Sequence, residues 1–283
     1  MITTNYTTIA NDLSIGTRIS RQKLMLSQDE IELIDHIDRV TNSLMNLTNR
    51  GYLSKIQEKL LVSHIQRSIL NSQPLSFVSI FCPPYKKGHN AFGYNSVVGE
   101  TTRANIALLS KIENICTNAG LEFSVTIYFS DLLLENYEEL QSHNYKHELA
   151  LAFADLKHRA SCFNVMKLSD LGNLAIIVGE AGPCQALNNN GAINNCDLQL
   201  LYARNQITYK SIYNWDDRKI QKRTDDLVLA YPYLADAMNK YHQNSIYFWS
   251  ETAIERTRLM PNLNLPLFVP RKSEKDNEHE IAC

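Results

Sequence analysis

Two short runs of apolar and β-branched residues constrain the fold of this chain most. LSFVSIFC (75–82) and EFSVTIYFS (122–130) have the length and composition of buried β-strands. Between them, Thr101 or Thr102 can cap a helix that Gly120 closes. A strand, a helix and a second strand in this order predict two parallel strands joined by a crossover helix.

The same alternation continues downstream. A helix is expected over Lys146–Arg159, followed by strand candidates at Phe163–Leu168 and Leu174–Val178. Repeated strand–helix alternation is typical of a mostly parallel sheet with helices on both faces. The sequence therefore predicts an α/β, Rossmann-like fold.

Helical patterns flank this core on both sides. Capping-box sequences at Ser27–Glu30 and Ser54–Gln57 each precede an amphipathic run, which predicts an N-terminal helical pair. The C-terminal third is read as helical as well, over residues 218–241 with an interruption at Pro232, and again over 246–260. With 283 residues, the chain is expected to form one α/β domain. Its parts are a helical segment (1–73), a sheet core (74–184), a loop and helical segment (185–270) and a flexible tail (271–283).

Composition narrows the classes of partner. The net charge is -2 and the pI about 6.4, so the basic excess that nucleic-acid binding requires is missing. The N-terminus lacks the basic start and apolar run of a signal peptide, and no stretch has the length of a membrane span. Six scattered cysteines without a C-x-x-C pair are read as reduced thiols. We expect a cytoplasmic protein that binds neither nucleic acid nor membrane.

Polar residues follow the predicted strands. The loops after parallel strands converge at one edge of the sheet, where ligands bind in open α/β folds. Lysine, tyrosine and carboxylate side chains on such a rim can bind phosphate or carboxylate groups and transfer protons, although the same residue types are common in turns, caps and solvated surfaces. We expect the catalytic side chains to be Lys86, Lys87, Glu100 and Asp131, and the substrate-binding side chains to be Tyr85, Ser130, Asp170 and Arg256.

The helix that begins near Thr101 should present its N-terminus to this rim. A helix N-terminus attracts anions through its free N–H groups and its dipole. Glu100 stands directly before the predicted cap, where a carboxylate can act as a base or complement the helix dipole.

Cofactor and metal motifs are weak. The chain has no G-x-G-x-x-G, no G-x-x-x-x-G-K-[ST] and no G-x-S-x-G, and only 10 glycines, so we expect no bound cofactor. GEAGP (179–183) is the best remaining place for S-adenosylmethionine or a nucleotide. His143, His147, Asp155 and His158 can share a helical face but match no recognised zinc motif, so we expect no metal.

Several of these segments together resemble the isocyanide (isonitrile) synthase family. They are SIFCPPYKKGHN, VVGETTRANIALLSKIENIC, VTIYFSDL and FNVMKLSDL, and the region they span is about residues 64–171. The resemblance implies an enzyme that converts the amino group of tyrosine or tryptophan to an isonitrile, taking the carbon from ribulose 5-phosphate without a metal. It also implies that Lys86 or Lys87 engages the sugar phosphate or its carbonyl, with Glu100 and Asp131 as rim carboxylates. Gly99 and Leu132 depart from the family pattern.

Three functional hypotheses follow. The first is a biosynthetic enzyme of secondary metabolism that acts on an amino-acid-like substrate and, on the resemblance, a sugar phosphate. The second is a transferase that uses S-adenosylmethionine or a nucleotide at Gly179–Pro183 on the same sheet. The third is a non-catalytic binding protein whose polar loop, Gln185–Asn195, contacts a partner.

Overall fold

The computed structural model of the chain describes five main ranges: residues 27–81, 97–131, 143–171, 215–249 and 262–271. Single residues at positions 199, 202, 203, 206, 210 and 260 are described as well. Between residues 55 and 167 helices and strands alternate, as the sequence predicted.

A five-stranded sheet forms the centre of the described structure. All four strand pairs are parallel, and the strand order is β3-β2-β1-β4-β5. This arrangement confirms the predicted α/β fold. The strands are β1 (Leu75–Phe81), β2 (Phe123–Phe129), β3 (Asn164–Lys167), β4 (Ser245–Phe248) and β5 (Leu267–Phe268).

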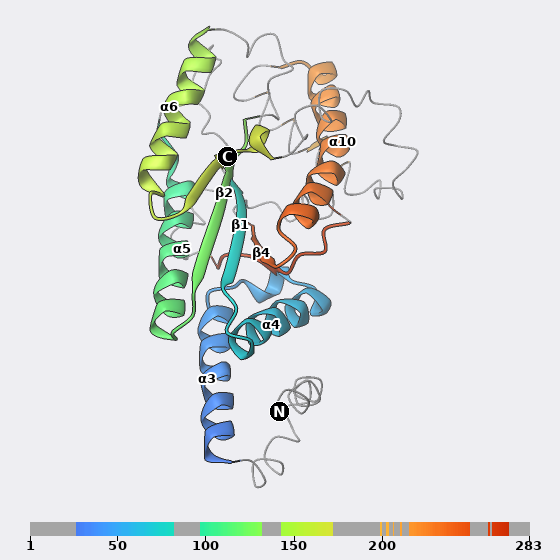
Figure 1. The fold of residues 1–283 in the computed structure, drawn as a ribbon. Helices are drawn as coiled ribbons and strands as arrows, with labels where there is room; N and C mark the ends of the chain where they lie inside the picture. The colour runs from blue at the N-terminus through green and yellow to red at the C-terminus, as the bar shows by residue number, and fades with distance from the viewer. Residues whose placement is uncertain are drawn as a thin grey trace.

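Helices cover both faces of the sheet, as predicted (Figure 1). Helices α3 (Gln28–Met45), α4 (Lys55–Leu70), α5 (Glu100–Asn118) and α6 (His143–Arg159) share one apolar cluster with Phe77 and Phe129. Helix α10 (Asp217–Tyr241) packs on the opposite face, against a second cluster that contains Val78 and Tyr128. Successive strand residues point to opposite faces, so each strand supplies both clusters. None of the described helices is long and apolar enough to cross a membrane.

The N-terminal helical pair begins at the predicted caps. At α3, the Ser27 hydroxyl accepts from the Glu30 N–H at 3.3 Å, and the Glu30 carboxylate accepts from the Ser27 N–H at 2.8 Å. At α4, Ser54 accepts from the Gln57 N–H at 3.2 Å, but the Gln57 side-chain oxygen accepts from the backbone N–H of Leu267 at 3.2 Å. The second box is therefore half formed, because Gln57 instead ties α4 to the edge strand β5.

The crossover helix α5 starts earlier than expected. Its N-cap is Gly99, with no side-chain cap, so Thr101 and Thr102 lie inside the first turn and the predicted threonine cap is wrong. Gly120 follows the helix with a φ of 70°, a left-handed conformation that glycine adopts without strain. The predicted closing glycine is confirmed.

The prediction of a wholly helical C-terminal third is wrong in part. Helix α10 is present and continues through Pro232, whose ring nitrogen cannot donate to the carbonyl of Val228. Residues 245–248, however, form the interior strand β4 instead of a helix, and β5 adds a further strand. All four residues of β4 are buried, so the run lacks the apolar–polar alternation that marks an exposed strand.

Candidate functional site

The strand order creates a switch point between β1 and β4. The chain leaves β1 for α5 on one face of the sheet, whereas it enters β4 from α10 on the other face. Ligands of open α/β sheets bind beyond the carboxyl ends of strands at such a point. The carboxyl ends of β1 and β2 point toward the top of Figure 1, and α6 and α10 both extend beyond them.

Hydrogen bonds define the last described residue pair of β1 and β4. Their register ends at Ser79 and Phe248, and there the buried Ser79 hydroxyl donates to the Phe248 carbonyl at 2.8 Å. Beyond this level β1 stays paired with β2 as far as Phe81. The chain after β4 stays with β5 instead, since the Trp249 N–H donates to the Phe268 carbonyl at 2.8 Å. Within the described residues, this pairing carries both strands to the carboxyl edge of the sheet, with the switch point between them.

Asp131 lies on the β2 side of this edge and is held by Ser169. The side chain is 7% exposed. Its Oδ1 accepts from the Ser169 N–H at 3.0 Å, and its Oδ2 accepts from the Ser169 hydroxyl at 2.5 Å. Bonds from one residue to both oxygens fix the carboxylate plane, while each oxygen keeps a further lone pair. The sequence predicted Asp131 as a site residue but not this role for Ser169.

Ser130 and Asp170 flank the same pair. Ser130 is buried, and its N–H donates to the Phe81 carbonyl at 2.9 Å, which joins the ends of β1 and β2. Asp170 is exposed, and its Oδ2 accepts from the Lys167 N–H at 3.1 Å in the turn after β3. Asp131, Ser130 and Asp170 therefore lie at one edge of the sheet, and their roles in a site stay a prediction.

A tyrosine–histidine pair lies on the α10 side of the sheet. The Tyr128 hydroxyl and the His242 Nε2 are 2.9 Å apart, with the donor set by the histidine tautomer. Burial raises the pKa of Tyr128, and the negative charge of Asp170 adds to the effect. Burial also lowers the pKa of His242. Both groups are thus neutral near pH 7, and the pair joins β2 to the end of α10. The two residues are 114 positions apart, so no local pattern could reveal them.

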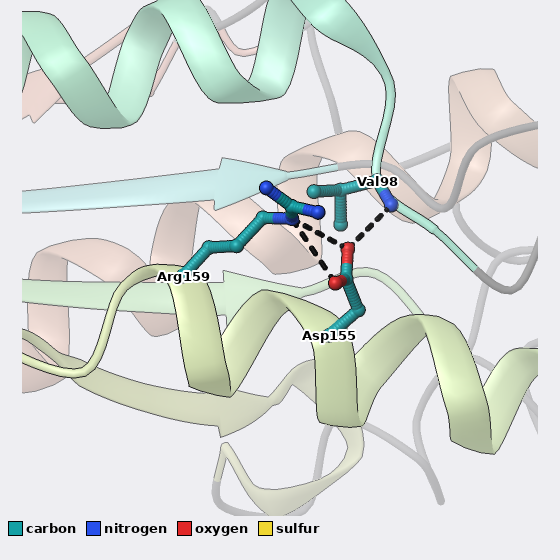
Figure 2. A network of polar contacts seen from close by, with 3 residues as sticks. All are labelled: Val98, Asp155 and Arg159. Carbon is teal, nitrogen blue, oxygen red and sulfur yellow. Dashed lines mark hydrogen bonds and ion pairs between the residues drawn. The ribbon is translucent and has the colours of Figure 1, made fainter.

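The N-terminus of α5 already faces a carboxylate. Figure 2 shows the Asp155 side chain of α6 between Val98, just before α5, and Arg159. Its Oδ2 accepts from the Val98 N–H at 2.8 Å, and the Arg159 Nε donates to both oxygens at 3.0 and 2.9 Å. Glu100 is the exposed first residue of the helix. Asp155, paired with Arg159, already accepts the N–H just before the helix, and Glu100 places a further carboxylate at the positive end of the dipole. An anion site at this helix N-terminus stays a prediction.

Electrostatics at Asp155 reflect competing effects. Burial acts to raise the pKa of this carboxyl group. The hydrogen bonds from Arg159 and from Val98, together with the positive charges of Arg159 and His158, outweigh burial and lower the pKa. The ionised carboxylate therefore holds α6 against the start of α5.

The remaining predicted residues lie outside the described ranges. They are Tyr85, Lys86, Lys87, Arg256, the segment Gly179–Pro183 and the loop Gln185–Asn195. Of the four residues that can share a face of α6, Asp155 bonds to Val98 and Arg159. Within the described part of the chain no three His, Cys, Asp or Glu side chains come together as a metal site.

Comparison with solved structures shows a likeness in fold. No family model matches the sequence, and no curated protein matches it. The crystal structure of the PvcA protein from Pseudomonas aeruginosa is similar, with a TM-score of 0.54 and 14% sequence identity. The match covers 86% of this chain and 94% of the PvcA chain. The two proteins thus share a fold over most of their lengths.

Proposed function

We propose that this chain is a small-molecule biosynthetic enzyme of the isocyanide synthase type. The observation that carries the proposal is the hydrogen-bonded pair of Asp131 and Ser169. Asp131 belongs to VTIYFSDL and Ser169 to FNVMKLSDL, two of the segments that carry the family resemblance. They are 38 residues apart in sequence, yet they meet at the carboxyl edge of the sheet, where α/β enzymes bind substrates.

The fold shared with PvcA supports the same proposal. We infer that the likeness over 86% of this chain reflects common membership of the isocyanide synthase family. The resemblance in motifs comes from residues 64–171, whereas the likeness in fold extends well beyond them. The two similarities are of different kinds and point in the same direction.

In this reading, an amino acid such as tyrosine or tryptophan binds at the edge beside β2. Asp131 is buried and oriented, so it suits the role of an acceptor for the substrate ammonium group and for its protons. Asp170 adds negative charge on the same side of the edge, and Glu100 adds a carboxylate at the start of α5. Lys86 or Lys87 would engage the phosphate or the carbonyl carbon of ribulose 5-phosphate, the source of the isonitrile carbon. The proposed reaction uses no metal and no further cofactor.

The test is a direct assay of the reaction. Purified protein is incubated with tyrosine or tryptophan and ribulose 5-phosphate, and the isonitrile is sought by mass spectrometry. The variant Lys86→Ala with Lys87→Ala should lose the product. The matched control is Lys55→Ala with Lys59→Ala, which removes two exposed lysines from α4 and should retain it.

Absence of the product with both amino acids, from folded protein, would refute the isocyanide synthase proposal. A thermal-shift comparison with S-adenosylmethionine would then test the transferase alternative.

A further inference from the structure

Trp249 is a fixed hydrogen-bond donor at the switch point. It follows β4 directly and is 4% exposed. Its backbone N–H is bonded to Phe268 at 2.8 Å, and its ring lies 5.6 Å from that of Tyr247 at an interplanar angle of 46°. The backbone hydrogen bond and the ring contact with Tyr247 orient the indole.

The indole N–H of Trp249 has no hydrogen-bond partner among the residues that the structure describes. An indole N–H can only donate, and a buried donor without an acceptor is unfavourable. The nitrogen is shielded from bulk solvent, so an acceptor on a bound ligand would satisfy it. Trp249 belongs to the apolar cluster on the α10 face and follows the carboxyl end of β4, beside the switch point at which a ligand is expected in this fold.

Among the described residues, carboxylates gather on one side of the carboxyl edge. On the β2–β3 side stand the carboxylates of Asp131 and Asp170, with Glu100 on α5. The ammonium of Lys167, at the end of β3, lies 5.5 Å from the Phe153 ring on the α6 face of the sheet. The acidic side suits a cationic group, and Trp249 offers a neutral donor for an anionic one.

The backbone spacing of β4 and β2 is comparable with the length of an amino acid and its two hydrogen bonds. β4 and β2 are separated by β1 alone, so their chains lie about 10 Å apart at two strand spacings. An amino acid has about 3 Å between its ammonium nitrogen and a carboxylate oxygen. With a hydrogen bond of about 2.9 Å at each end, it spans about 9 Å.

We propose that the carboxylate of the substrate accepts a hydrogen bond from the Trp249 indole while its ammonium group faces Asp131. This assignment rests on the proposed function, since it assumes an amino acid as substrate. It makes Trp249 a substrate-binding residue and sets the direction in which the amino acid lies across the ends of β4, β1 and β2. The side chain of the amino acid then projects away from the line joining Trp249 and Asp131.

The test removes the donor alone. The chain has only two tryptophans, Trp215 and Trp249, so in a Trp215→Phe background a tryptophan analogue enters at position 249 only. L-benzothienylalanine, incorporated in a tryptophan auxotroph, replaces the indole N–H with sulfur and keeps the ring shape. Binding of L-tyrosine, and of tyramine, which lacks the carboxylate, is measured by calorimetry. We expect the analogue to weaken L-tyrosine binding at least tenfold, about 1.4 kcal/mol, and to leave tyramine binding unchanged.

A second measurement uses the intact chain. With 15N-labelled tryptophan, L-tyrosine should move the indole N–H resonance of Trp249 downfield, whereas tyramine should leave it in place. Replacing either tryptophan with phenylalanine assigns the two resonances, so the measurement does not depend on one variant folding.

The outcomes separate the two proposals. If L-tyrosine binds and the analogue binds it equally well, or if tyramine binding falls as much, the assignment of Trp249 is overturned and the proposed substrate class stands. If neither L-tyrosine nor L-tryptophan binds the intact chain, the amino-acid substrate and the Trp249 assignment are both overturned.

Discussion

Asp155 allows the most quantitative prediction, because its partners and their burial are known (Figure 2). In Asp155→Ala, the N–H of Val98, a residue that is 3% exposed, loses its acceptor. Leaving a buried donor unpaired costs about 1–3 kcal/mol. The ion pair with Arg159, whose side chain is 37% exposed, adds only about 0.3–0.5 kcal/mol. The free energy of unfolding should therefore fall by about 1.3–3.5 kcal/mol.

Two companion variants separate these contributions. Arg159→Ala removes the ion pair and leaves the Val98 bond, so it should lower the free energy of unfolding by about 0.5 kcal/mol. Asp155→Asn keeps a side-chain oxygen for Val98 but loses the charge. Its free energy of unfolding should lie between those of Asp155→Ala and Arg159→Ala. Urea denaturation at pH 7, followed by circular dichroism, gives the midpoint of each variant. If Asp155→Ala cost no more than Arg159→Ala, the hydrogen bond to Val98 would have no role in stability, and the reasoning would be refuted.

The pH dependence of the same variants is a further check. The pKa of Asp155 is lowered in the folded state, so its charged form stabilises the fold above the unfolded value of about 3.9. This stabilisation is lost as pH falls through the lowered pKa. The difference between wild type and Asp155→Ala should be constant from about pH 8 to pH 5 and shrink below about pH 4.

Two other predictions concern Ser169, which holds Asp131, and His242, which bonds to Tyr128. Ser169→Ala should free one oxygen of Asp131 and reduce the proposed activity mainly through kcat. Ser169→Thr keeps the hydroxyl and should restore the activity. If steady-state kinetics showed an equal loss in both variants, this role of the Ser169 hydroxyl would be contradicted. Because burial lowers the pKa of His242, the unfolded chain binds its proton first, and stability should fall as pH drops below about 6.5. In His242→Gln, whose amide can still bond to Tyr128, urea midpoints between pH 8 and pH 5 should fall less than those of wild type; parallel curves would exclude His242 as the cause.

Local elements were predicted well because their signals lie within a few residues. The cap at Ser27 depends on a residue three positions away, and Gly120 acts through its own backbone. Strands β1 and β2 stand out because they are seven-residue apolar runs between turn residues. The cap at Ser54 shows the limit, since Gln57 has a local partner available but bonds to Leu267, 210 positions away.

The short strand β4 was missed for a physical reason. Its four residues are buried on both sides, so they carry no alternation, and they follow a long helix closely. Periodicity cannot distinguish such a run from a buried helical segment. Because β4 was not predicted, the expected site was built from residues after β1, β2 and β3. Trp249, which follows β4, was not among them.

The sequence by itself determined the class of fold, most of the helices and strands, and the polar residues that follow β2 and β3. These are consequences of backbone preferences and local hydrogen bonds. Only the tertiary structure decided that β4 lies beside β1, that Ser169 holds Asp131 and that Trp249 stands at the switch point. Those contacts join segments 38 to 169 residues apart. They are selected by the burial of both sheet faces and by pairing between distant strands, which no local stretch of the chain encodes.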